Sequence, residues 1–257
     1  MKIEPRERPN IFSHSGVKEF FSYVASEYNV FPLCEWKGQN GIILRHDCDL
    51  SIIQAHALAQ IEKESGVRSS FFILVHNSVY NPGAENNRDL LREMVDEGFE
   101  IGLHFDISYY GDVDDVGLEE KASREAEILS EIIGKNVQSV SIHNPSVTGR
   151  YPIFEKFINA YDPAVFSEEV YWSESRMAPR KDVWEFVNRA NERTLQVLMH
   201  PLHFTENGFG YEMIFLSHLE ELALQLDANF GLNTGFARCF PEGLRAKVNQ
   251  LLAINAS

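Results

Sequence analysis

Aspartate and histidine residues stand at the ends of four short apolar segments of this chain. They are Asp47 and Asp49 after residues 41–46, His104 after 99–103, His143 after 138–142 and His200 after 195–199. The apolar segments have the length and the Ile, Leu, Val and Phe content of strands. In parallel α/β folds the carboxyl ends of the strands meet at one rim, where active sites are built. We therefore expect these side chains to lie together.

The residue types and spacing favour a hydrolytic metal site. Residues two apart in an extended segment project to the same side, so Asp49 could bind a cation while Asp47 takes a proton from water. Neutral imidazoles of His104 and His143 would complete a His/His/carboxylate set. Such a set leaves positions open for water and substrate, and it suits Zn²⁺, Co²⁺ or other first-row ions.

Each of these features also has a structural explanation. An Asp-x-Asp pair after a strand is common at the start of a helix, because open backbone amides favour acidic residues there. A single histidine at a strand end is commonly a packed residue. We assign that structural role to five other histidines: His14, His46, His56, His76 and His218.

Strand-like and helix-like patterns alternate along the chain, which predicts an α/β fold with a largely parallel sheet or barrel covered by helices. Apolar residues recur at helical spacing between the strands. No repeat or linker interrupts the sequence, so we expect one domain over residues 1–257. The strands are expected at 41–46, 69–75, 99–103, 138–143 and 195–199, the helices near 52–61, 90–95, 122–133, 211–229 and 241–254, and an acidic loop at 108–118.

The composition is that of a globular protein with an acidic surface. The 257 residues include 23 Lys and Arg against 38 Asp and Glu, a net charge of −15, which argues against nucleic acid or an anionic membrane as the main partner. The three cysteines, Cys34, Cys48 and Cys239, form no CxxC pair and indicate a reducing compartment. With neither a signal-peptide pattern nor a membrane-spanning one, we expect a cytoplasmic protein without membrane insertion. The motifs GxxxxGK[ST], GxGxxG and GxSxG do not occur.

A series of segments gives a family resemblance. RHDCD, GVRSSFFIL, EGFEIGLHFD, SIHNPS, YWSES and LMHPLHF occur in this order between about residues 41 and 204. In order and spacing they resemble the polysaccharide deacetylase superfamily of carbohydrate esterases, in its divergent Asp-x-Asp branch. The resemblance implies a distorted (β/α) barrel of about seven parallel strands. It also implies removal of N-acetyl groups with a divalent metal, usually Zn²⁺, with Co, Ni or Mn as alternatives.

The resemblance also implies roles for single residues. Asp47 would be the general base, Asp49 and His104 metal ligands, and His200 the general acid. The family's usual second histidine, four residues after His104, is Ser108 here, so we expect the third ligand to be His143. Glu174 either orients His200 or is a solvated surface carboxylate. Four residues are expected near the pocket without an assigned role: Arg45, Asn144, Arg150 and His203.

The expected activity is hydrolysis of an intracellular precursor. An N-acetylated sugar linked to a nucleotide or a lipid, used for surface polysaccharide or O-antigen assembly, fits the absence of targeting signals. Two alternatives stay open at this point. The first is another amidohydrolase on the same barrel, acting on a cyclic ureide, an imide or a formamide. The second is a non-catalytic homologue of the deacetylases. The sequence does not indicate the oligomeric state.

Overall fold

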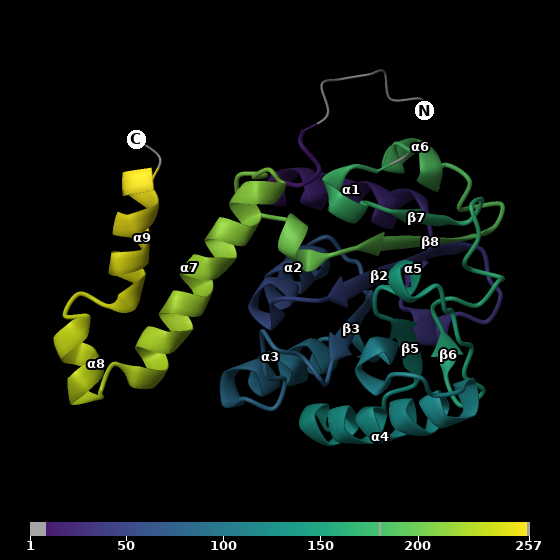
Figure 1. The fold of residues 1–257 in the computed structure, drawn as a ribbon. Coiled ribbons are helices and arrows are strands. Elements are labelled where there is room, and N and C mark those ends of the chain that lie inside the picture. Colours follow the sequence, from purple (N-terminus) through teal and green to yellow (C-terminus); the bar gives the residue numbers. More distant parts are fainter. Residues whose placement is uncertain (1–8, 180, 256–257) are drawn as a thin grey trace. The chain divides into compact units, whose positions relative to one another are not determined.

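The protein was analysed as a computed structural model that describes residues 9–179 and 181–255 (Figure 1). It forms two compact units, Met1–Gly208 and Phe209–Ser257, and the motif region 41–204 lies in the first. That one domain spans 1–257 stays a prediction. The strands are β1 Val30–Phe31, β2 Gly41–Cys48, β3 Ser70–Leu74, β4 Glu100–Phe105, β5 Ser139–Ile142, β6 Ile158–Asn159, β7 Tyr171–Ser173 and β8 Thr194–Met199. The helices are α1 His14–Glu27, α2 Ile52–Glu64, α3 Glu85–Asp96, α4 Asp115–Ile133, α5 Pro145–Thr148, α6 Val183–Val187, α7 Tyr211–Phe230, α8 Thr234–Cys239 and α9 Leu244–Asn255.

The strands of the first unit form one parallel sheet in the order β6-β5-β4-β3-β2-β8-β7, with β1 paired to β2. In the described part of the chain β6 and β7 are not paired with each other, so the sheet is a curled half-barrel rather than a closed barrel. Gln196 of β8 bridges the open side, because its amide donates to the carbonyl oxygens of Ala160 (2.9 Å) and Val165 (3.1 Å). The predicted parallel α/β architecture of about seven strands is confirmed.

Strand β2 explains why this sheet has both a filled interior and a helical cover. Its residues alternate between the two faces, as strand geometry requires. Ile42 and Leu44 pack in a cluster with Phe20 and Phe21 of α1, whereas Ile43 belongs to the cluster around Phe72 and Leu103. Burial of both faces accounts for the continuous apolar pattern of the strands.

The helices begin where the sequence supplies capping side chains. Ser13 accepts a hydrogen bond from the Gly16 amide at the start of α1, and Ser51 accepts one from Gln54 at the start of α2. Asp114 does the same for α4, so the predicted loop at 108–118 is wrong in part. Residues 107–110 form a 3₁₀ turn, and α4 begins at Asp115. No helix among residues 9–179 and 181–255 is long and apolar enough to cross a membrane.

The second unit contains α7, α8 and α9. The sequence predicted α7 within one residue of its observed end and placed the start of the last helix three residues early. It missed α8. Asp227 of α7 accepts hydrogen bonds from the amides of Leu244 (2.6 Å) and Arg245 (3.0 Å), which joins α7 to the start of α9.

Candidate metal and acid–base site

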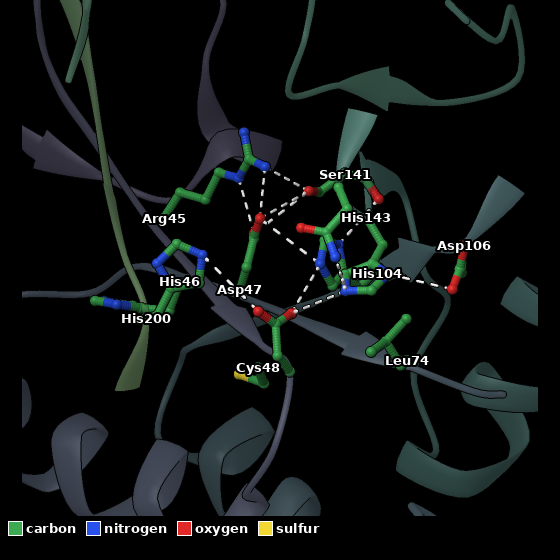
Figure 2. A network of polar contacts seen from close by, with 12 residues as sticks. Arg45, His46, Asp47, Cys48, Leu74, His104, Asp106, Ser141, His143 and His200 are labelled. Carbon is green, nitrogen blue, oxygen red and sulfur yellow. Dashed lines mark hydrogen bonds and ion pairs between the residues drawn. The ribbon is translucent and has the colours of Figure 1, made fainter. Parts of the chain in front are cut away.

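The carboxyl ends of four strands bring the predicted residues together. Asp47 lies near the end of β2 and His104 near the end of β4. His143 follows β5 directly, and its amide donates to the Phe105 carbonyl oxygen of β4 at 2.9 Å. His200 follows β8 directly. The expected convergence on one rim is therefore observed, and Figure 2 shows these side chains pointing toward one another.

Asp49, His104 and His143 form a compact set of possible metal ligands. One ligand atom from each lies within 4.8 Å of the others. Asp49 Oδ1 is 3.2 Å from Nε2 of His104 and 3.8 Å from Nε2 of His143. Ligands about 2.1 Å from a tetrahedral Zn²⁺ stand about 3.4 Å apart, so the separations suit such an ion.

The Oδ1 atom of Asp49 supports this fit. It is buried, and among the described residues no donor is aligned with it as a hydrogen bond requires, although His104 Nε2 is close. A buried carboxylate oxygen without an aligned donor is costly unless a cation compensates it. Burial works to raise the pKa of Asp49, but the imidazole of His104 outweighs it and lowers the pKa.

The Nδ1 atoms of His104 and His143 each lie at hydrogen-bonding distance from an acceptor oxygen. His104 Nδ1 lies 3.2 Å from the carbonyl oxygen of Ser141, which is an acceptor only, so Nδ1 is the protonated nitrogen and Nε2 is free to bind a metal. His143 Nδ1 lies 3.2 Å from Oδ2 of Asp106 in the same way. On the other side, the Asn144 amide is 2.9 Å from His143 Nε2, at the nitrogen that would face a metal.

Asp106 is a residue of the candidate site that the sequence interpretation missed. Its Oδ1 accepts hydrogen bonds from the Ser108 amide (2.9 Å) and hydroxyl (2.6 Å). Ser108, at the position where the motif resemblance leads us to expect a histidine, thus fixes the carboxylate that contacts His143. The sequence did contain a pattern that could have indicated Asp106. It follows His104 by two residues, the same spacing by which Asp49 follows Asp47.

Asp47 is bound by an arginine from its own strand. Arg45 donates from Nε to Oδ1 at 2.9 Å and from Nη2 to Oδ2 at 2.7 Å, and both residues are buried (Figure 2). Nη2 of Arg45 also donates to Ser141 Oγ at 2.5 Å and to the Tyr161 hydroxyl at 3.1 Å. Burial favours the neutral form of Asp47, but the guanidinium outweighs it and holds the pKa of Asp47 well below its usual range.

Glu174 connects two histidines beside the metal set. Its Oε1 lies 2.9 Å from Nδ1 of His200 and 2.9 Å from Nδ1 of His203, and it also accepts from the His200 amide. Glu174 is fully buried, so the alternative of a solvated surface carboxylate is wrong. Nε2 of His200 faces Asp49 Oδ2 at 3.9 Å.

The Glu174 charge makes His200 a stronger base than an ordinary histidine. Burial alone would lower the pKa of His200, but the carboxylate of Glu174 outweighs it and raises the pKa to about 9. Burial would raise the pKa of Glu174, yet the two imidazoles lower it to about 2. His200 is therefore an imidazolium at neutral pH, the form that a proton donor needs.

Of the remaining residues, Arg150 and His46 lie outside this constellation, and His203 belongs to it. Arg150 pairs with Asp115 at the surface (2.6 Å). His46 points away from the site toward α2, where its Nε2 meets Glu62 at 2.5 Å, so its structural assignment is confirmed. His203 completes the Glu174 cluster, whose three ligand atoms also lie within 4.8 Å of one another.

Several solved structures are similar to this chain. No protein-family model and no curated protein matches the chain. One similar structure is a CE4 family pseudoenzyme from Bacillus anthracis, with 13% identity and a TM-score of 0.43 over 70% of this chain and 60% of the other. The match thus spans less than two thirds of that protein.

Two further similar structures are described as deacetylases. A chitin deacetylase from Colletotrichum lindemuthianum has 16% identity and a TM-score of 0.44, over 70% of this chain and 81% of the other. A peptidoglycan deacetylase from Bacillus subtilis has 17% identity and a TM-score of 0.42, over 74% and 95%. At these identities, and with TM-scores below 0.5, no role is assigned to this chain from these similarities.

Proposed function

We propose that this protein is a metal-dependent carbohydrate N-deacetylase of the polysaccharide deacetylase superfamily. The observation that carries the proposal is the set of Asp49, His104 and His143, with Asp47 and His200 on either side. Asp49, His104 and His143 would hold a divalent cation, most suitably Zn²⁺, with Co, Ni or Mn as alternatives. Such a cation supplies Lewis-acid activation of an amide carbonyl when bound.

The protein's own residues then divide the proton transfers. In amide hydrolysis a water molecule adds to the carbonyl carbon, the C–N bond breaks, and acetate and an amine leave. Asp47 accepts the water proton at a carboxylate oxygen, and Arg45 fixes that carboxylate in place. His200 gives its Nε2 proton to the departing nitrogen, while Glu174 holds Nδ1 and stabilises the imidazolium.

As substrate we propose an N-acetylated sugar of an intracellular precursor, linked to a nucleotide or a lipid, for surface polysaccharide such as O-antigen. This part rests on the family resemblance of the sequence motifs. The chain would then act in the cytoplasm.

The test is acetate release by the metal-loaded protein from a panel of N-acetylhexosamines, free and joined to nucleotide or lipid carriers. Asp49→Asn should lose both the bound metal and the acetate release. Asp112→Asn, on an exposed loop, is the matched control and should retain both. If the wild-type protein binds metal but releases no acetate from any member of the panel, the hydrolase proposal is wrong.

A second candidate, a non-catalytic homologue, is favoured by one observation. The two hydrogen bonds from Arg45 neutralise Asp47 and hold its pKa well below the usual range, which weakens it as a proton acceptor. In that case Asp47→Asn would leave the biological phenotype of the gene intact, whereas a deacetylase would lose its activity.

A further inference from the structure

A second set of possible metal ligands lies beside the first. Glu174, His200 and His203 each offer one ligand atom, and these atoms lie within 4.8 Å of one another. Oε1 of Glu174 is 2.9 Å from Nδ1 of His200 and 2.9 Å from Nδ1 of His203. One carboxylate with two imidazoles is a known ligand set of zinc sites in which a water molecule takes the fourth position. The Glu174 cluster therefore has the ligands of a zinc site as well as the hydrogen bonds of an acid–base group.

The backbone after β8 places the two imidazoles on one side. His200 directly precedes the 3₁₀ turn Pro201–His203, and residues three apart in such a turn lie one above the other. The ring centroids are 5.3 Å apart and the ring planes are inclined by 49°, with both Nδ1 atoms next to Glu174. The sequence His-x-x-His thus supplies two nitrogen ligands to a carboxylate that follows the neighbouring strand β7.

The burial of the cluster favours a bound cation. Glu174 is fully buried and His203 is buried, whereas the side chain of His200 is 20% exposed. Solvent screens a buried carboxylate only weakly, so a cation next to it is attracted more strongly than at the surface. The exposed part of His200 leaves a path by which an ion and its water ligand can reach the carboxylate.

The present distances are those of hydrogen bonds, and they would lengthen when an ion binds. Ligands about 2.1 Å from a tetrahedral Zn²⁺ stand about 3.4 Å apart, which is about 0.5 Å more than the two separations in the Glu174 cluster. The histidines can move by this amount because they lie in a turn rather than within a strand. The ion also displaces one Nδ1 proton from each imidazole to the solvent. The Glu174 cluster should therefore bind a cation more weakly than the Asp49 set, where Oδ1 has no aligned donor among the described residues.

We propose that Glu174, His200 and His203 bind a second divalent cation, most suitably Zn²⁺, and that this cation inhibits the protein. The site depends on these three side chains alone, whereas the inhibition rests on the proposed function, in which His200 donates a proton. An imidazole that coordinates a cation through Nδ1 is neutral, and it gives up its Nε2 proton less readily than an imidazolium does. Since Nε2 of His200 faces Asp49 Oδ2 at 3.9 Å, excess metal would disable the proton donor next to the Asp49 set.

Metal titration of the full chain tests the site. The metal-free wild-type protein is titrated with Zn²⁺ by calorimetry and with Co²⁺ by its visible absorption, which reports the coordination of each bound ion. Two ions per chain are expected, the second bound more weakly than the first. Binding of a single ion per chain in excess metal would overturn the proposal.

The variant His203→Asn separates the two sites. The amide nitrogen of asparagine can replace Nδ1 as a hydrogen-bond donor to Glu174, but it is not a zinc ligand of the imidazole kind. This variant should lose the second ion and bind the first with unchanged affinity. His56→Asn is the matched control, because His56 of α2 also meets a carboxylate, that of Glu93, at 3.2 Å, and this variant should still bind two ions. Two ions bound to His203→Asn would refute the placement.

Crystals of the wild-type protein soaked in excess Zn²⁺ locate the second ion without any substitution. Anomalous scattering at the zinc absorption edge should give one peak between Asp49 and His104 and another between Glu174 and His203. If the second peak is missing or lies elsewhere, the Glu174 cluster is not a metal site.

Acetate release at increasing Zn²⁺ concentration tests the inhibition. The wild-type rate should fall about 100-fold as the second site fills, which is the lower end of the contribution of a general acid. His203→Asn should keep the rate that it has with one equivalent of Zn²⁺. If two ions bind but no acetate is released with one equivalent, the second site stands and the deacetylase proposal fails. If acetate is released and the second ion does not slow it, the reaction stands and the inhibition is wrong.

Discussion

Replacing Glu125 by glutamine should stabilise the protein at alkaline pH and have little effect at acidic pH. Glu125 of α4 is buried and accepts a hydrogen bond from the Tyr110 hydroxyl at 2.6 Å. Burial raises the pKa of Glu125 to about 7 from its ordinary value of 4.5, with the Tyr110 hydrogen bond opposing the shift. Glutamine keeps an oxygen for that hydrogen bond but carries no charge to bury.

The sign and size of the effect follow from the shift. Between pH 4.5 and 7 the unfolded chain releases the Glu125 proton while the folded protein retains it, so stability falls as the pH rises through this window. A shift of about 2.5 pH units corresponds to about 3 kcal/mol, fully lost only above pH 7. The Glu125→Gln protein should therefore exceed the wild type by about 2–3 kcal/mol more at pH 8 than at pH 5.

Urea unfolding of both proteins at pH 5 and pH 8 measures this difference. Titrating groups that do not contact Glu125 contribute equally to both proteins and cancel. Glu120→Gln, on an exposed face of the same helix, is the matched control and should show no pH-dependent difference. If the difference in unfolding free energy between Glu125→Gln and wild type is the same at the two pH values, the argument from burial is refuted.

The metal set, the buried ion pair and the first helix give further tests. Asp106→Asn should weaken Zn²⁺ binding about 10- to 100-fold, measured by competition with a chromogenic chelator, and unchanged affinity would show that Asp106 does not orient His143. Arg45→Met should lower the unfolding free energy by about 3–5 kcal/mol, because it leaves Asp47 buried without a partner. The double variant Arg45→Met/Asp47→Leu should recover most of that loss. If the single and the double variant lose the same unfolding free energy, the ion pair between Arg45 and Asp47 is not the cause. Ser13→Ala should lower the unfolding free energy measured in urea by about 1 kcal/mol, because α1 loses its N-cap. Ser26→Ala, within the same helix, is the control and should not show this loss if capping is the cause.

The main strands and the site could be predicted because both depend on local pattern. Strands that are buried on both faces read as continuous apolar runs, so β2, β3, β4, β5 and β8 were placed to within about two residues at either end. Their parallel arrangement then sends all carboxyl ends to one rim, which brings Asp49, His104 and His143 together without any knowledge of the loops.

The parts that escaped prediction depend on contacts between distant residues. Strands β6 and β7 have only two and three residues, too few for a period to be visible. Glu174 gives no local sign of burial, because the two imidazoles that compensate it come from the turn after β8. The Ser141 hydroxyl on β5, which donates to Asp47, and the Tyr161 hydroxyl beyond β6, which accepts from Arg45, likewise meet this pair only when the sheet has curled.

The two aspartates of the first motif show how the fold prepares one position for a cation and not the other. Strand alternation places Arg45 and Asp47 on the same face, so the guanidinium balances the Asp47 charge within the protein itself. Asp49 lies beyond the strand and beyond the reach of Arg45, and the groups around it are imidazoles. Of these, His104 and His143 are held by acceptors at Nδ1, so their Nε2 atoms can offer lone pairs. Oδ1 of Asp49 is buried without an aligned donor among the described residues, and a divalent cation between it and these two nitrogens would compensate its charge.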